Sequence, residues 1–384
     1  LVGSEMCIRD SFPSWETLPH ECLSPSIDTV GRRLEVLHRL HLAAHPDPHS
    51  PVAPLRVVVA ATRSLIQPTQ ASLAETEPLI LRVDQEIEFS DVPSLLTELA
   101  YERVDLVSRR GDFAVRGGII DIFPATAEHP VRIEFWGDEI SDIRTFSVAD
   151  QRTIPDADLT WVAMYPCSEL LMTTQVEHRA AELYQDLVGY AAIADMLDKL
   201  AQGVPVAGRE AFIPALASEE LCLLPSFLPT QAITVVCDQE KIRTRTADLT
   251  RTCAEFLAAS WESAAEGGQA PIDLLHLGQG AYRTLRDVRQ ETLEKDGRWW
   301  VLNPPGMLNV DAGADTPTRE IPWTAAPAPR GDQAAIEELI EGLRQRLGKD
   351  GTPVFIIGPA TTYRRLHQQF RDRNAVMNLS LIHI

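Results

Sequence analysis

The chain has 384 residues, a length that suits two or three domains, and its 45% hydrophobic and 23% charged residues are typical of globular proteins. With 35 basic and 55 acidic residues it carries a formal net charge of −20, which argues against a broadly basic surface for non-specific binding to nucleic acid. The six cysteines form no C-x-x-C pair, and neither a membrane-spanning apolar run nor a signal peptide is evident, so we expect a cytoplasmic protein without a membrane partner.

Both ends of the chain look foreign to the rest. Residues 1–11 and 378–384 resemble translated sequencing-adapter strings, and the chain starts at a leucine instead of a methionine. We exclude both ends from functional reasoning. The expectation that follows is a fragment, cut at both ends, of something longer.

Residues 12–82 have the pattern of alternating helices and strands. Apolar residues at helical spacing follow Asp28, which we expect to cap the helix, and the pattern ends before Pro46. The short apolar run Leu55–Ala60 is typical of a buried parallel strand. This order of elements predicts a piece of a doubly wound sheet.

Residues 83–166 change character, because strand patterns replace the helix–strand alternation. A helix is predicted around Val92–Tyr101, ahead of a pair of long strands. Gly117-Gly118 are predicted to lie within the first of these strands, as a bulge or a close backbone approach. Gly137-Asp138 are predicted to form the turn that joins the two later strands.

The segment Val131–Trp136 alternates apolar and charged side chains, which is the period of a half-buried strand. If the aliphatic and phenyl groups point inward, Arg132, Glu134 and Trp136 point outward. Tryptophan and arginine are the residue types that anchor protein interfaces, although a lone tryptophan can also pack under a neighbouring loop. Residues 101–153 hold seven arginines, no lysine and ten acidic residues, a mildly acidic balance that suits a protein partner better than DNA.

Residues 167–312 return to the α/β pattern. A long helical stretch is predicted over Glu177–Gln202, and Ala232–Cys237 reads as a buried strand followed by a helix that Asp238 can cap. Trp299-Trp300 are expected to pack at the edge of a core. Prolines between Leu302 and Asp332 predict a linker, after which a helix at 334–347 and a strand at 353–358 begin a further unit.

The residues that would make this chain an enzyme are missing from it. There is no G-x-x-x-x-G-K-[ST] loop to hold phosphates, and the Gly348-Lys349 pair is followed by Asp350. The histidines at 38, 41, 45 and 49 have partly helical spacing, but no cysteine or carboxylate completes an obvious zinc set, so we expect no metal site. No nucleophile-elbow signature is present, so we expect no catalytic residues. The alternative that a phosphate loop lies upstream of residue 12 stays open.

Several long motifs resemble a known family. The most specific are DFAVRGGIIDIFP (112–124), PVRIEFWGDEISDIRTF (130–146) and ADQRT (149–153), supported by FPSWETLPHE (12–21), GREAFIPAL (208–216) and LPSFLP (224–229). On these motifs, residues 12–377 resemble the N-terminal module of the bacterial transcription-repair coupling factors, which is similar to the excision-repair protein UvrB.

Two departures separate this chain from UvrB itself. UvrB has an aromatic-rich β-hairpin after its first conserved strand, whereas Ser14–Asp28 is short and holds Trp15 as its one aromatic residue. UvrB also has an intact phosphate loop, whereas the copy in the coupling factors is degenerate. Both departures favour the coupling factors.

The resemblance implies an α/β fold in which a degenerate RecA/P-loop-like, UvrB-type domain is split by a smaller α+β inserted domain and followed by the start of a further α/β domain. It assigns residues 12–82 and 167–312 to the split domain and residues 83–166 to the insertion. Residues 313–330 would then be the linker, and residues 331–377 the start of the third domain.

In this family the inserted domain recruits UvrA, and its contact positions correspond to Arg116, Arg132 and Trp136, the last of which is often phenylalanine. Glu134, on the same predicted face, is expected to set the register or to meet a basic partner residue. We expect both arginines to form bidentate hydrogen bonds with carboxylates of UvrA, and Trp136 to supply desolvated area.

For the whole protein, the resemblance implies recruitment of UvrA to stalled RNA polymerase in transcription-coupled nucleotide excision repair. ATP and Mg²⁺ would serve a DNA translocase downstream of this chain, and RNA polymerase and DNA would also bind there, while downstream domains mask the UvrA-binding face. Two alternatives stay open: a UvrB-type helicase ATPase whose phosphate loop lies upstream, and a module that binds DNA directly. The upstream sequence tests the first, and the salt dependence of duplex binding tests the second.

Overall fold

The computed structural model describes residues 9–18, 21, 23–186, 191–217, 219, 221–265 and 282–303. The chain divides into two compact units, residues 1–307 and 308–384, and the second unit lies outside the described residues. The predicted linker, the predicted helix and strand beyond it and the foreign-looking C-terminal end fall there as well. The first unit is a mixed α/β structure with several sheets.

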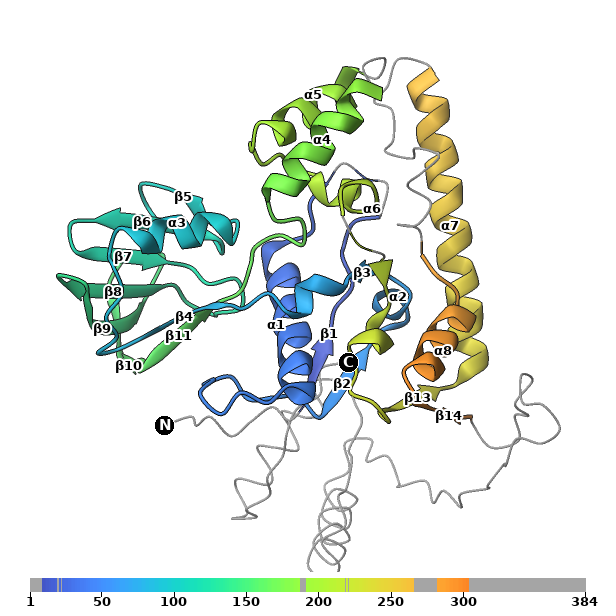
Figure 1. Cartoon of the computed structure of the whole chain (residues 1–384), viewed down its shortest axis with the longest axis horizontal. Helices are drawn as coiled ribbons and strands as arrows, with labels where there is room; N and C mark the ends of the chain where they lie inside the picture. The colour runs from blue at the N-terminus through green and yellow to red at the C-terminus, as the bar shows by residue number, and fades with distance from the viewer. Residues whose placement is uncertain are drawn as a thin grey trace, which may run out of the picture. The chain divides into compact units, whose positions relative to one another are not determined.

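The first part of the chain forms a parallel strand pair connected by a helix. Strand β1 (Arg9–Phe12) pairs with β2 (Val57–Ala60), and α1 (Ile27–Ala44) lies between them in sequence (Figure 1). The helix was predicted from its apolar spacing, but Ser26, not Asp28, is the N-cap residue, and Asp28 lies in the first turn. Three residues from the foreign-looking N-terminal end belong to β1, because Arg9–Ser11 pair with Val57–Val59.

Helix α1 contributes one side of a small core. Val30, Leu34 and Leu37, which share a stripe on the helix, are buried against Phe12 of β1. Short elements complete this region: α2 (Thr62–Leu65), β3 (Thr69–Gln70), η1 (Ala71–Ala74) and β12 (Leu221–Cys222), which pairs antiparallel with β3.

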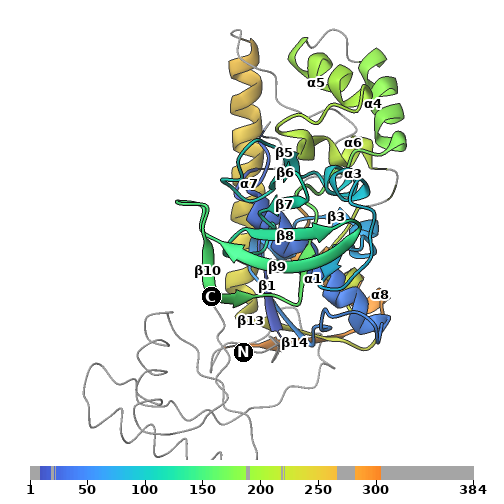
Figure 2. The same ribbon diagram turned by 90° about the vertical axis from the view of Figure 1, so that its left-hand side faces the viewer.

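The chain enters and leaves its strand-rich part through an antiparallel pair, β4 (Leu79–Arg82) and β11 (Trp161–Met164). Between them lie α3 (Asp91–Glu98) and a six-stranded sheet of order β10-β9-β8-β7-β6-β5. Its strands are β5 (Glu102–Arg103), β6 (Asp112–Arg116), β7 (Ile119–Ile122), β8 (Val131–Trp136), β9 (Glu139–Phe146) and β10 (Thr153–Asp158). Figure 2 shows β8 and β9 running side by side.

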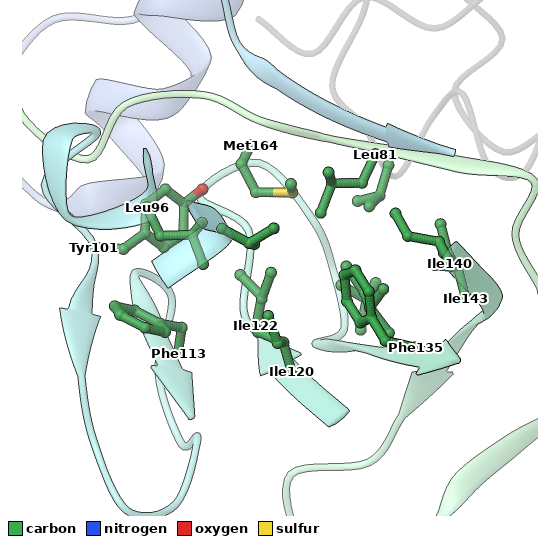
Figure 3. Close-up of a cluster of buried hydrophobic side chains, with 14 of the residues drawn as sticks. Leu81, Leu96, Tyr101, Phe113, Ile120, Ile122, Phe135, Ile140, Ile143 and Met164 are labelled. Atoms are coloured by element: carbon green, nitrogen blue, oxygen red, sulfur yellow. The ribbon is translucent and has the colours of Figure 1, made fainter. Parts of the chain in front are cut away.

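One face of the sheet is buried in a core of its own. Ile120, Ile133 and Ile143 come from three neighbouring strands and are fully buried. Leu96 of α3 packs onto the same cluster (Figure 3). Met164 of β11 joins them. Inward side chains at every second position therefore hold the sheet against α3 and the β4–β11 pair.

The two glycine turns differ in how well the sequence predicted them. Gly137 and Asp138 join β8 to β9 as predicted, and Gly137 has a φ of +67°. Gly117 and Gly118 were predicted inside a strand, which is wrong: they form the turn between β6 and β7, where Gly117 has a φ of +58°. A tight hairpin needs positive φ, which glycine adopts without steric cost.

After the sheet the chain forms two helices, α4 (Thr174–Asp186) and α5 (Ala191–Ala201), which pack on each other. One continuous helical stretch was predicted here, so that prediction is wrong. Gly189 lies between the two helices in the sequence, and glycine disfavours a helix interior by about 1 kcal/mol. Three short elements follow: η2 (Arg209–Phe212), α6 (Ile213–Leu216) and η3 (Leu224–Phe227).

The last described elements are a second parallel strand pair and two helices. Strand β13 (Ile233–Cys237) was predicted as a buried strand, and the strand is present, but Ile233 and Val235 are exposed, so the predicted burial is wrong. It pairs with β14 (Arg298–Leu302), while α7 (Gln239–Ala265) and α8 (Leu285–Glu294) lie between them in sequence. Asp238 precedes α7, as expected, and its Oδ1 accepts a hydrogen bond from the Lys241 backbone nitrogen at 3.4 Å. Trp299 packs at the edge of a core, whereas Trp300 is exposed. No helix in the described part of the chain is long and apolar enough to cross a membrane.

Candidate protein-interaction site

Strand β8 presents a core side and a solvent side. Val131, Ile133 and Phe135 are buried, as the alternation predicted. The intervening residues belong to the opposite side of the sheet, which we call the outer face and define by Arg116, Arg132, Glu134, Trp136 and Arg144. Period-two alternation is sufficient to place the β8 residues there, because a strand with one apolar face can bury that face in only one register.

Strand register decides which of the predicted site residues are neighbours. Arg116 on β6 pairs with Ile119 on β7, and Ile119 pairs with Glu134 on β8. Arg116 and Glu134 are therefore two strand spacings apart, about 10 Å. Trp136 lies about 13 Å along β8 from Arg132 at the usual strand rise. All four predicted site residues lie on the outer face, which is the arrangement that a single docking surface needs.

Arg132 is already paired within the sheet. Its Nε and Nη2 donate to the two carboxylate oxygens of Asp121 on β7, at 2.7 and 2.9 Å. The Asp121 side chain is 4% exposed and that of Arg132 is 22% exposed. The hydrogen bond with Asp121 raises the pKa of Arg132 further above its usual range, so the guanidinium is always charged. The two Arg132 nitrogens that were expected to bind a partner carboxylate are thus already bound to Asp121 in this structure.

Arg132 also lies on a small apolar cluster that covers one end of the outer face. Its guanidinium carbon is 4.9 Å from the centre of the Phe146 ring. Phe146 packs there with Val107, Ala114 and Phe123. The cluster and the Asp121 pair hold the Arg132 side chain in one position, so Arg132 contributes to the fold as well as to the surface.

Arg116 and Glu134 are less constrained. Arg116 is exposed, and its Nη2 donates a hydrogen bond to the backbone oxygen of Asp105. The Glu134 side chain is 39% exposed and lies 4.0 Å from Arg144 Nη1. Both side chains can rearrange when a partner approaches.

Sequence reasoning missed Arg144. It lies on β9 directly opposite Arg132, and its guanidinium bonds to the Asp142 carboxylate. Like charges opposite each other destabilise a strand pair, but here each arginine has its own carboxylate. The register of β8 against β9 includes an irregularity after Glu134, so the position of Arg144 could not be read from its spacing in the sequence.

Trp136 is the most exposed large apolar side chain in the described part of the chain, at 83%. None of the aromatic or cation–ring contacts among the described residues involves it. The alternative that Trp136 packs under a neighbouring loop is therefore wrong. An indole that the fold leaves in water has no structural role that explains it.

The other candidate chemistry has a structural explanation. His38 is buried in α1, and burial lowers its pKa to about 4, with a smaller effect from His41. The His41 and His45 rings stack at 4.5 Å. Within the described residues, no group of histidine, cysteine, aspartate and glutamate side chains could hold a metal ion.

Comparison with known proteins identifies the part of the chain that holds the outer face. Residues 79–170 match the UvrB interaction domain. Over 362 residues, or 92% of the chain, the sequence is 46% identical to the transcription-repair-coupling factor of Mycobacterium tuberculosis. The chain belongs to the transcription-repair-coupling factor family.

Two more distant members of the family match smaller shares of the chain. The transcription-repair-coupling factor of Bacillus subtilis is 36% identical over 44% of the chain, and that of Escherichia coli is 26% identical over 59%. The chain spans 28% of the length of the mycobacterial protein, 14% of the Bacillus protein and 19% of the Escherichia protein. The outer face lies within the matched domain, which supplies the context for a function.

Proposed function

We propose that residues 79–170 bind UvrA through the outer face of the six-stranded sheet. The observation that carries the proposal is the exposed Trp136, which shares the outer face with two paired arginines inside a UvrB interaction domain. Tryptophan and arginine contribute most of the binding energy in many protein interfaces. Trp136 supplies the area that becomes desolvated, while Arg116, Arg132 and Glu134 orient the partner.

At the level of the whole protein, the chain is the UvrA-recruiting part of a coupling factor that brings UvrA to stalled RNA polymerase in transcription-coupled nucleotide excision repair. The similarity to transcription-repair-coupling factors supports this role. RNA polymerase, DNA, ATP and Mg²⁺ bind to parts of such a protein outside this chain, where an ATP-driven translocase acts in the cytoplasm. Contacts with those parts mask the outer face until the polymerase is engaged.

The domain arrangement is part of the same proposal. Residues 12–82 and 167–312 form one degenerate RecA/P-loop-like domain, and residues 83–166 are inserted in it. The antiparallel β4–β11 pair supports this division, because it brings the entry and exit of the insertion together.

The charges of the outer face favour a protein partner over DNA. Arg132 is paired with Asp121, and Arg144 with Asp142. Binding to duplex DNA depends on releasing counterions from phosphates, which needs unpaired cationic side chains. Arginines that already have carboxylate partners contribute little of that free energy.

Replacing Trp136 with alanine tests the proposal. We expect Trp136→Ala to weaken UvrA binding by about 2 kcal/mol, or roughly 30-fold in Kd, because the partner loses the contact area of the indole. Titration calorimetry of the full chain with purified UvrA measures the change. The exposed side chain makes no core contacts, so the thermal midpoint should stay within about 1 °C of the parent value.

Trp300→Ala is the matched control, since Trp300 is also exposed, at 52%, but lies on β14 outside the UvrB interaction domain. Its affinity for UvrA should equal that of the parent chain. If a folded Trp136→Ala variant binds UvrA as tightly as the control, the outer face is not the docking surface.

A further inference from the structure

Beyond the four predicted residues, the outer face has an acidic rim close to Trp136. The strand register places Glu139 of β9 directly opposite Trp136, and Glu134 lies two positions before it on β8. Asp138, in the turn between these strands, is exposed. Three carboxylates thus lie within a few residues of the exposed indole.

A further segment adds to the same rim. Residues 84–89 run along the start of β9: Glu86 forms a β-bridge with Glu139, and the Ile87 nitrogen donates to the Asp138 backbone oxygen at 2.8 Å. The Phe89 nitrogen donates to the Asp138 carboxylate at 3.0 Å. These contacts hold the exposed Glu86 beside Glu139, so two acidic residues that are distant in sequence occupy one edge of the face.

Among the described residues, the cationic side chains of the outer face neutralise this rim only at Glu134, which lies 4.0 Å from Arg144. Arg132 is committed to Asp121, and Arg144 lies between Asp142 and Glu134. Arg116 is about 10 Å from Glu134 across the sheet, on the side away from β9. Among the described residues, Glu86 and Glu139 have no salt bridge with a basic side chain.

We infer that the surface around Trp136 receives a basic patch of the partner protein, with a lysine or arginine side chain of UvrA seated on the indole. Here the inference rests on the proposed function, because it names the chemistry of the partner at that same face. A cation over an indole is attracted by the electron-rich ring face, and the neighbouring carboxylates strengthen this attraction. At this end of the outer face the partner therefore supplies the cation and this chain the carboxylates, the opposite of the expected pairing between arginines of this chain and carboxylates of UvrA.

Charge reversal at the rim tests the inference. We expect Glu86→Lys/Glu139→Lys to raise the Kd for UvrA at least about tenfold at low salt, because like charges then face each other across the contact. The difference should shrink as salt is added, since screening shortens the reach of exposed charges from about 10 Å at 0.1 M to about 3 Å at 1 M. Binding of the full chain to UvrA is measured by titration at both salt concentrations.

The control must have the same change in net charge at a distance from the face. Glu182→Lys/Glu294→Lys provides it, since these exposed residues lie on α4 and α8, and its affinity should equal that of the parent. A second comparison isolates the ring: Trp136→Phe should bind about fivefold more tightly than Trp136→Leu, because phenylalanine keeps a π face and leucine does not.

The outcomes separate this inference from the proposed function. If reversal of the rim leaves binding unchanged or tightens it while Trp136→Ala still weakens it, the partner surface is not basic and the inference is overturned, but docking at this face stands. If neither change affects UvrA binding in folded variants, both are overturned. The inference is supported if Glu86→Lys/Glu139→Lys weakens UvrA binding and the control Glu182→Lys/Glu294→Lys does not.

Discussion

At the residue scale, Arg132 shows why a variant that loses UvrA binding does not by itself identify a residue in contact with UvrA. The Asp121 carboxylate beneath it is 4% exposed and takes two hydrogen bonds from the guanidinium. Removing Arg132 leaves a buried carboxylate without a cation. Arg116 differs, since it is exposed and its guanidinium donates to the backbone oxygen of Asp105. The two arginines therefore have different effects on stability even if both contact UvrA.

This difference is measurable by urea denaturation of single variants. We expect Arg132→Ala to lower the free energy of unfolding by roughly 2–3 kcal/mol, less than a fully buried pair would lose because Arg132 is 22% exposed. Arg116→Ala should lower it by less than about 0.5 kcal/mol.

A double variant checks the cause. Asp121→Asn/Arg132→Gln replaces the ion pair with two amides that can bond to each other, and it should recover about half of the lost stability. An Arg132→Ala variant as stable as Arg116→Ala would mean that the Asp121 pair contributes nothing to the fold. The UvrA affinity of an Arg132 variant must therefore be corrected for its loss of stability before Arg132 is assigned a share of the binding energy.

At the scale of elements, α1 lies very close to the loop that follows β7. A Cβ built on Gly31 would be 2.5 Å from the Ala125 Cβ and 3.2 Å from Thr126 Cγ2. Ala125 is fully buried in the core of the sheet. The helix can approach this core because position 31 carries no side chain, although glycine is a poor residue for a helix interior.

We therefore expect Gly31→Ala to destabilise the chain even though alanine favours helix formation by about 1 kcal/mol. Overpacking of a filled core costs about 1–3 kcal/mol, so the net loss in chemical denaturation should reach up to about 2 kcal/mol. Ala125→Gly in the same chain removes the clashing methyl group and should restore most of the lost stability. A stabilised Gly31→Ala variant would show that the helix does not pack this closely.

The same elements show what the sequence could predict. The faces of β8 follow from the alternation of Val131–Trp136, which is a local signal, and the apolar stripe of α1 is equally local. The Arg132–Asp121 pair and the position of Arg144 depend on which strands are neighbours and in what register. Pairing of this kind is non-local, so the exposed tryptophan could be predicted from local alternation, whereas the carboxylate that pairs with Arg132 and the acidic rim could not. Gly117 was misplaced for the opposite reason, since a glycine in a strand pattern fits either a bulge or a turn.

At the scale of the whole molecule, a buried polar network ties the end of the UvrB interaction domain to the first α/β segment. Glu169, next to the end of the matched range 79–170, accepts hydrogen bonds from Arg33 Nε at 2.5 Å and Trp15 Nε1 at 2.8 Å. Arg33 is fully buried, and the Thr69 hydroxyl donates to the other carboxylate oxygen at 3.2 Å. The exit of the domain is thus fixed by charge-assisted bonds to three separate segments.

Glu169→Gln tests whether this network couples the two parts of the chain. The amide keeps the shape and one acceptor for Trp15 but removes the charge that compensates Arg33, so we expect a loss of about 3–5 kcal/mol in unfolding free energy. Because Glu169 joins the two parts, hydrogen exchange should accelerate in both α1 and the β8–β9 pair. Glu182→Gln, at an exposed site on α4, should change neither. Faster exchange confined to α1, with β8–β9 protected as before, would show that the interaction domain folds independently of the network, and UvrA docking would then need no support from the α/β part.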